Sequence, residues 1–158
     1  MDSRALRGHP YAVFFGFTRC PAVCSTTMLG MSSLLREVGR EAADLKFYFI
    51  TLDPERDTAE TLTNFLSSFG PEIVGLTGTG EEILRVVKSF HVYYSKVPTE
   101  HGDYTIDHSA LVYLVDRKGL VVDFLSFDER HDIALKKLKG LLLEDSPARD
   151  RSVEAHAF

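Results

Sequence analysis

Two cysteines, Cys20 and Cys24, give the strongest chemical signal in this chain of 158 residues, because they are its only cysteines and lie four positions apart. They follow a buried strand predicted over Tyr11–Phe17 and open a helix whose first residue is expected to be Pro21, which needs no N–H partner there. This spacing puts both side chains on one face, with Cα atoms about 6 Å apart. The free N–H groups and the dipole of the helix favour thiolates. The pair can therefore cycle between dithiol and disulfide, or hold a soft metal ion.

Two thiolates do not complete a metal site, so a third ligand is sought among the six histidines. His108 lies in Asp107-His108-Ser109, directly before a buried strand predicted over Leu111–Val115. In an α/β sheet such a loop can lie against the turn that carries the cysteines. By spacing alone a structural histidine is the more frequent case, so His108 is a candidate and no more. Solvated, loop or helix-end positions are predicted for the others, which are His9, His91, His101, His131 and His156.

The elements that position these residues follow from apolar periodicity. The helix that the cysteines open is predicted to end at about Val38, and three more helices are predicted over 58–69, 80–90 and 133–142. Strands are predicted over Tyr11–Phe17, Leu45–Leu52, Ile73–Leu76, Val92–Val97, Leu111–Val115 and Leu120–Leu125. Asp57 is expected to cap the second helix, and Thr79 with Glu82 to form a capping box. Pro98–Asp107 is expected to be a polar loop with its tip at Glu100–Asp103.

This order predicts the α/β class: parallel strands with crossover helices, then an antiparallel hairpin and a final helix. A mixed sheet covered by helices on both faces is a thioredoxin-like arrangement. The sequence shows no repeat and no linker, so we expect a single domain over residues 1–158. Its lead-in (1–9) and its tail (147–158) are expected to be loosely ordered.

Composition excludes several classes of function. The net charge is −5, and no basic stretch could hold a nucleic-acid backbone or an acidic membrane surface. No apolar run approaches the roughly 20 residues of a membrane span, and the first residues do not form a signal peptide.

Four motifs together resemble the Sco/SenC family of copper chaperones. They are Phe15-Gly16-Phe17-Thr18-Arg19-Cys20-Pro21-Ala22-Val23-Cys24, Asp53-Pro54-Glu55-Arg56-Asp57-Thr58, Gly75-Leu76-Thr77-Gly78 and Asp107-His108-Ser109. Their order and spacing fit the family from about Gly8 to Leu143.

The resemblance implies a thioredoxin fold and one bound copper ion, Cu(I) or Cu(II), with Cys20, Cys24 and His108 as ligands. It implies a carrier rather than an enzyme, one that helps to assemble the binuclear copper site of cytochrome c oxidase and cycles its cysteines. Asp53 would be an outer-sphere or partner-contact residue. The expected partners are the copper subunit of the oxidase and either another copper chaperone or a thiol reductant. The expected location is the periplasm or the mitochondrial intermembrane space, with a membrane anchor that precedes this sequence.

Two positions depart from the family pattern. Ala22 stands where an acidic residue is usual, and Ser25 stands where a proline is usual. The loss of one carboxylate beside the thiolates is expected to lower the pKa of the cysteines without removing a ligand.

Two other functions remain open. A thiol-disulfide oxidoreductase without a metal would use the same cysteines, although such enzymes favour two intervening residues and a proline where Ala110 stands. A zinc site of two cysteines and one histidine would still need a fourth ligand.

Overall fold

The computed structural model describes residues 6–143 and 153–154. Its strands are β1 (Tyr11–Gly16), β2 (Lys46–Thr51), β3 (Ile73–Leu76), β4 (Tyr94–Pro98), β5 (Tyr104–His108), β6 (Leu111–Val115), β7 (Leu120–Ser126) and β8 (Val153–Glu154). Its helices are α1 (Val23–Val38), α2 (Ala59–Leu66), α3 (Gly80–Ser89) and α4 (His131–Leu142), with short 3₁₀ turns at Gly39–Ala42 and Glu100–Gly102.

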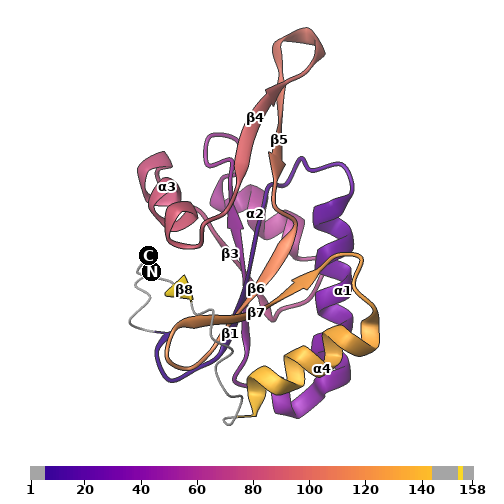
Figure 1. Cartoon of the computed structure of the whole chain (residues 1–158). Helices are drawn as coiled ribbons and strands as arrows, with labels where there is room; N and C mark the ends of the chain where they lie inside the picture. Colours follow the sequence, from indigo (N-terminus) through magenta and orange to yellow (C-terminus); the bar gives the residue numbers. More distant parts are fainter. Residues whose placement is uncertain (1–5, 144–152, 155–158) are drawn as a thin grey trace.

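The main sheet has the strand order β3-β2-β1-β6-β7-β8 (Figure 1). Strands β1, β2 and β3 are parallel, and β6 pairs with β1 in the antiparallel sense. All six residues of β1 are buried, because helices cover both faces of the sheet and leave neither face polar. The predicted mixed sheet of the thioredoxin-like class is confirmed.

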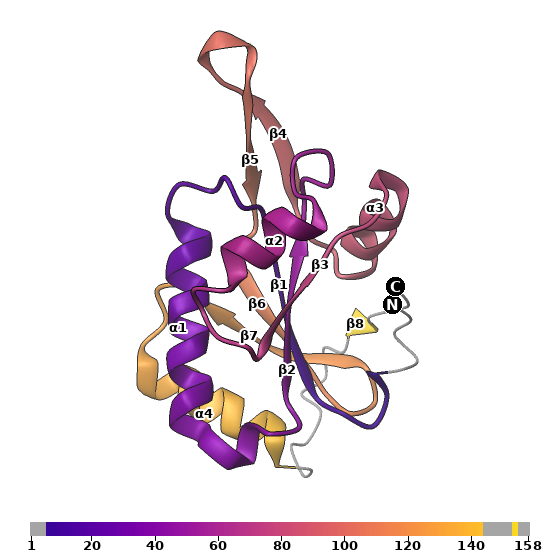
Figure 2. The same cartoon turned by 180° about the vertical axis from the view of Figure 1, so that it is seen from behind.

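The two faces of the sheet carry separate apolar clusters. Alternate residues of β1 point to opposite faces, so Phe14 packs with α1, α2 and α4, and Phe15 packs with α3. Figures 1 and 2 show α1 and α4 on one side of the sheet and α3 on the other. Helices thus pack against both faces of the sheet, and this packing fixes the position of the carboxyl end of β1.

Strands β4 and β5 form a separate antiparallel hairpin that projects from one end of the main sheet (Figure 1). The pairing runs from Tyr94 opposite His108 to Pro98 opposite Tyr104. The prediction of a polar loop over Pro98–Asp107 was therefore wrong, and only its tip is irregular. The tip bends through positive φ angles at His101 and Gly102.

The first residues of α2 and α3 show which side chains cap these two helices. Thr58, not Asp57, caps α2, with its hydroxyl accepting from the Thr61 N–H. The capping box of Thr79 and Glu82 is confirmed at α3. Asp57 was assigned wrongly because an Asp before an apolar periodic run resembles a cap, whereas its carboxylate has other partners, described below.

The two ends of the chain are only partly described. Leu6 is buried in the cluster beneath α3, and the Gly8 N–H donates to the Arg117 carbonyl. Most of the tail predicted over 147–158 lies outside the described residues, and Val153–Glu154 pairs with β7. In the described part of the chain, every helix is too short or too polar to span a lipid bilayer.

Candidate metal centre

The cysteines lie on both sides of the start of α1. Cys20 is half-buried in the turn after β1, where its N–H donates to the Phe17 carbonyl. Cys24 is fully buried in the first turn of the helix, and both thiols are free. The helix starts at Val23, with Ala22 at the cap and no side-chain cap bond, so the prediction of Pro21 as its first residue was wrong. The first turn therefore leaves its N–H groups free to face the sulfurs.

His108 comes to these sulfurs from the far part of the chain. It is the last residue of β5, and its Nε2 lies 3.8 Å from the Cys24 Sγ. Its Nδ1 lies 3.1 Å from the Ser109 carbonyl oxygen, so Nδ1–H donates to that carbonyl and Nε2 is the ring nitrogen on the side of the sulfurs. The ring edges of Phe14 and Phe17 pack against the imidazole. The imidazole is thus oriented by both a hydrogen bond and aromatic contacts.

The ligand atoms of Cys20, Cys24 and His108 all lie within 4.8 Å of one another. Within residues 6–143 and 153–154, this is the one cluster of three or more His, Cys, Asp or Glu residues close enough to hold a metal ion. The other described histidines lie outside it; His131, for example, pairs with Glu37 on the surface. The structure therefore brings together the three residues that the sequence indicated.

The two thiols have unequal acidity. The pKa of Cys20 is lowered to about 4, mainly because the Cys24 side chain donates a hydrogen bond to its sulfur. Burial of the sulfur opposes this shift, whereas the His108 side chain and the backbone N–H groups of Cys24 and Ala22 lower the pKa further. The pKa of Cys24 is raised, because its proton is held in that bond and its sulfur is buried. At neutral pH the pair is a thiolate at Cys20 and a thiol at Cys24, whose proton a metal ion would displace.

Gly16, the last residue of β1, makes room for the buried sulfur. A Cβ atom at this position would lie 2.9 Å from the Cys24 Sγ and 2.9 Å from the Phe14 ring. A glycine is therefore required where β1 passes behind the site. The signal in the sequence is a lone glycine inside an aromatic run just before the first cysteine, and the sequence reasoning did not use it.

Asp53 lies in the loop after β2 and is fully buried. Its carboxylate accepts hydrogen bonds from the Tyr104 hydroxyl at 2.7 Å and from the Arg56 Nε. Its described partners are thus residues of its own loop and of β5, and it does not belong to the cluster of three ligands. The structure places Asp53 as a support of the hairpin that carries His108.

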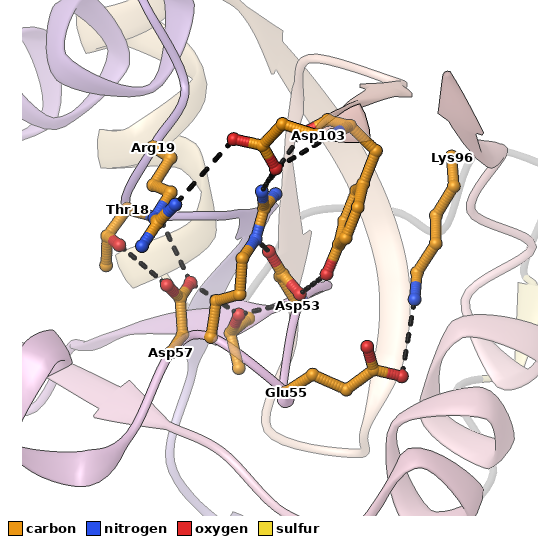
Figure 3. A network of polar contacts seen from close by, with 10 residues as sticks. Thr18, Arg19, Asp53, Glu55, Asp57, Lys96 and Asp103 are labelled. Atoms are coloured by element: carbon orange, nitrogen blue, oxygen red, sulfur yellow. Dashed lines mark hydrogen bonds and ion pairs between the residues drawn. The ribbon is translucent and has the colours of Figure 1, made fainter. Parts of the chain in front are cut away.

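Asp57 is a second buried carboxylate of this loop, and the sequence reasoning missed its role. It accepts from the Thr18 N–H at 2.9 Å, from the Thr18 hydroxyl at 2.6 Å and from the Thr51 hydroxyl at 2.7 Å (Figure 3). Because Thr18 lies two residues before Cys20, Asp57 anchors the turn that presents the half-buried sulfur. The sequence signal that could have indicated this role is the position of Asp57 in the same motif as Asp53.

Two sulfurs and one imidazole nitrogen are a soft donor set. They suit Cu(I) in a site of low coordination number, and Cu(II) with one added weak ligand. A structural zinc site requires four protein ligands, and this cluster has three. The same two sulfurs, four residues apart, also suit a disulfide.

Comparisons with known proteins agree with this geometry. The SCO1/SenC family model matches residues 1–143. The human mitochondrial SCO1 homolog is 40% identical over 121 residues, which cover 75% of this chain and 40% of the human protein. The matched part of the chain covers 58% of the length of another curated relative, so the chain spans about half of the length of these proteins.

Solved structures show the same fold. Copper-bound ScoI of Bradyrhizobium japonicum is 45% identical, with a TM-score of 0.81 and coverage of 88% of each chain. BsSco, a member of the Sco family of cytochrome c oxidase assembly proteins in which a disulfide switch was identified, is 26% identical, with a TM-score of 0.65 and coverage of 88% of this chain and 83% of its own. With the family match over most of the sequence and the cluster of two cysteines and one histidine in place, the chain belongs to the SCO1/SenC family.

Proposed function

We propose that this protein is a copper metallochaperone that holds one copper ion between Cys20, Cys24 and His108 and serves the assembly of the binuclear copper site of cytochrome c oxidase. The observation that supports this most directly is the convergence of two sulfurs and one imidazole nitrogen within 4.8 Å, from segments 84 residues apart. Copper bound to a relative of 45% identity supports the identity of the metal.

The burial of the three ligands suits a cargo that is loaded and released. Cys24 is fully buried, whereas Cys20 and His108 are half-buried and open one side of the site to solvent. A partner could reach the metal from this side and exchange ligands one at a time. In a structural metal site, by contrast, protein ligands fill every coordination position.

The same sulfurs support a second activity, a cycle between dithiol and disulfide. The Cys20 thiolate is the nucleophile in such a cycle, and Cys24, four residues further along the chain in the first turn of α1, is the resolving thiol. The disulfide switch identified in BsSco is consistent with it. In the proposed function, oxidation of the pair removes both thiolates and so prevents copper binding.

The proposed partners are the copper subunit of the oxidase and a second copper chaperone or a thiol reductant. The proposed location is the bacterial periplasm or the mitochondrial intermembrane space, in agreement with the mitochondrial relatives. Asp53 is proposed to act from outside the ligand set.

Metal titration tests this function. Reduced protein is titrated with Cu(I) and, separately, with Cu(II), in competition with a chelator of known affinity. We expect one tight site for each ion. His108→Ala should weaken Cu(II) binding by at least about tenfold and Cu(I) binding less, because two thiolates suffice for Cu(I). His9→Ala, which removes an exposed imidazole, is the matched control. Unchanged binding of both ions in His108→Ala would refute the assignment.

A disulfide-exchange assay separates the carrier from a metal-free oxidoreductase. The rate with a model disulfide is measured with and without a copper chelator. A carrier should exchange disulfides slowly when it is free of copper, and it should not react when copper occupies the two sulfurs. Fast catalytic turnover that is indifferent to copper would favour the oxidoreductase.

A further inference from the structure

The segment Asp53–Asp57, which joins β2 to α2, is a tight turn placed between the two halves of the site. The N–H groups of Arg56 and Asp57 donate to the Asp53 carbonyl at 3.1 and 2.8 Å, and both carboxylates are fully buried. Figure 3 shows Asp57 beside Thr18, with Asp53 on the side of Asp103. One short loop thus contacts the turn before the cysteines and the hairpin that carries the histidine.

On the cysteine side, the contact is made by the Asp57 carboxylate. Its two carboxylate oxygens accept the N–H and the hydroxyl of Thr18 and the hydroxyl of Thr51. Since Thr51 belongs to β2 and Thr18 follows β1, Asp57 fixes the loop to the carboxyl ends of both strands. The sulfur side of the site is therefore rigid with respect to the loop.

On the histidine side, the contact is made by Asp53 and Arg56 with Tyr104. The Tyr104 hydroxyl donates to Asp53 at 2.7 Å, and the Arg56 guanidinium lies 3.7 Å from the centre of the Tyr104 ring. The Arg56 Nη1 also donates to the Tyr104 carbonyl at 3.0 Å and to the Asp103 carboxylate at 2.8 Å. Four contacts thus bind this end of the hairpin to the loop.

Strand geometry transmits this contact to the ligand. Tyr104, Ile106 and His108 occupy alternate positions of β5 and so share one side of the strand. Ile106, between the other two, is buried in the cluster beneath α3. The strand therefore has one inward side on which Tyr104 contacts the loop, Ile106 packs in the core and His108 faces the sulfurs.

We infer that Arg56 and Tyr104 are positioning residues, which hold the β4–β5 hairpin against the Asp53–Asp57 loop and so set the distance from the His108 imidazole to the two sulfurs. This inference rests on the proposed function, because it concerns the same copper site. It predicts that a change at Arg56 or Tyr104 affects Cu(II) binding more than Cu(I) binding, because Cu(II) depends on the imidazole, whereas Cu(I) is held by the thiolates.

The test is a double-mutant cycle of Tyr104→Phe and His108→Ala. Tyr104→Phe removes only the hydroxyl that donates to Asp53 and keeps the ring beneath Arg56. We expect it to lower Cu(II) affinity about tenfold, as loss of an outer-shell contact typically does. We expect Cu(I) affinity to change by less than about twofold, and no further loss of Cu(II) affinity when His108 is already Ala. Arg56→Gln should give the same pattern.

Two readouts accompany the affinities. The thiolate-to-Cu(II) charge-transfer absorption and the electron paramagnetic resonance spectrum of Tyr104→Phe should shift toward those of His108→Ala, and thermal unfolding verifies that the variant is folded. Tyr93→Phe is the matched control, because Tyr93 carries the same hydroxyl in an exposed position next to β4.

The outcomes distinguish the two proposals. If the wild-type protein binds neither Cu(I) nor Cu(II), the proposed function fails. If it binds both and folded Tyr104→Phe retains wild-type Cu(II) affinity and spectra, the function stands and the positioning role is wrong. A loss that affects Cu(I) and Cu(II) equally, or that persists in the His108→Ala background, also overturns the positioning role.

Discussion

At the scale of single residues, the site depends on two sulfurs that differ in acidity and burial although they lie only four residues apart in the sequence. Cys20 is half-buried and accepts the hydrogen bond of the Cys24 thiol, so it is the thiolate of the pair. Cys24 keeps its proton in an apolar pocket beside Phe14. An incoming metal ion or disulfide should therefore react first with Cys20.

The lowered pKa of Cys20 predicts an unusual pH dependence of alkylation. With a pKa of about 4, this thiol remains a thiolate from pH 8 down to about pH 5, so its rate of reaction with iodoacetamide should stay nearly constant over that range. An ordinary thiol would lose about tenfold in rate for each pH unit below its pKa, near 8.5. Peptide mapping by mass spectrometry identifies the modified cysteine. A Cys20 rate that falls tenfold per unit between pH 8 and pH 6 would contradict the assignment.

Gly16 predicts a steric effect on the buried sulfur. In Gly16→Ala the new methyl group meets the Cys24 Sγ and the Phe14 ring, each at 2.9 Å, so one of them must move. We expect a loss of about 1–3 kcal/mol in the free energy of unfolding, as overpacked cores show, and weaker copper binding. Denaturant unfolding and chelator competition measure the two effects.

Gly30→Ala is the matched control for this substitution. A Cβ at Gly30, on the exposed side of α1, meets no atom within 4 Å. Helix propensity should make this variant more stable by up to about 1 kcal/mol. If both alanine variants behaved alike, close packing at Gly16 would not be the cause.

At the scale of elements, the site is assembled by loops that the main sheet holds at one end. The turn after β1 brings the sulfurs, the hairpin brings the imidazole, and the Asp53–Asp57 loop contacts both. Arg19, next to Cys20, adds an exposed ion pair with Asp103 of the hairpin, at 3.9 Å. An exposed pair of this kind contributes little. The buried carboxylates therefore carry most of the connection.

Asp57→Ala tests the connection on the cysteine side. The change leaves the N–H and hydroxyl of Thr18 and the hydroxyl of Thr51 without their acceptor. A fully buried group left without a partner costs about 1–3 kcal/mol, and this applies to the Thr51 hydroxyl, whereas the half-buried Thr18 groups cost less. We therefore expect a total loss of about 3 kcal/mol in the free energy of unfolding. Glu55→Ala, in the same loop but with a side chain that is 71% exposed, should change stability by less than about 0.5 kcal/mol. Equal effects of the two substitutions would show that Asp57 does not anchor the turn.

The order of these elements could be predicted from the sequence, because each buried strand and each amphipathic helix has a periodicity of its own. The β4–β5 hairpin was missed because half of its sequence is polar, and the contacts that stabilise it, such as Tyr104 with Asp53, join residues about 50 positions apart. Asp57 was taken for a cap for the same reason: its partners Thr18 and Thr51 precede it in other segments. Local patterns singled out the two cysteines and made His108 a candidate, and the resemblance to the family suggested the three as ligands, but neither showed what positions them.

At the scale of the whole molecule, a bound copper ion would join segments that are otherwise connected only through the sheet. The sulfurs belong to the turn before α1 and to its first turn, the imidazole belongs to the hairpin, and Cys24 and His108 are 84 positions apart in the sequence. Because unfolding separates the imidazole from the two sulfurs, the complete set of three ligands exists only in the folded state, and a metal ion that uses all three stabilises that state. At a free metal concentration 100 times the dissociation constant, the gain is about 2.7 kcal/mol, which corresponds to about 5–10 °C in Tm for a chain of this size.

Calorimetry on reduced protein, with and without one equivalent of Cu(I) and a chelator that sets the free metal concentration, measures this shift. Protein oxidised to the Cys20–Cys24 disulfide should show no copper-dependent shift, since neither thiolate is then available. His108→Ala should lose the shift with Cu(II) and keep most of it with Cu(I), because the imidazole is the ligand that Cu(II) requires and the two sulfurs suffice for Cu(I). A copper-dependent rise in Tm that persisted in the disulfide form would place the metal elsewhere, and the separation of 84 residues would then have no bearing on its binding.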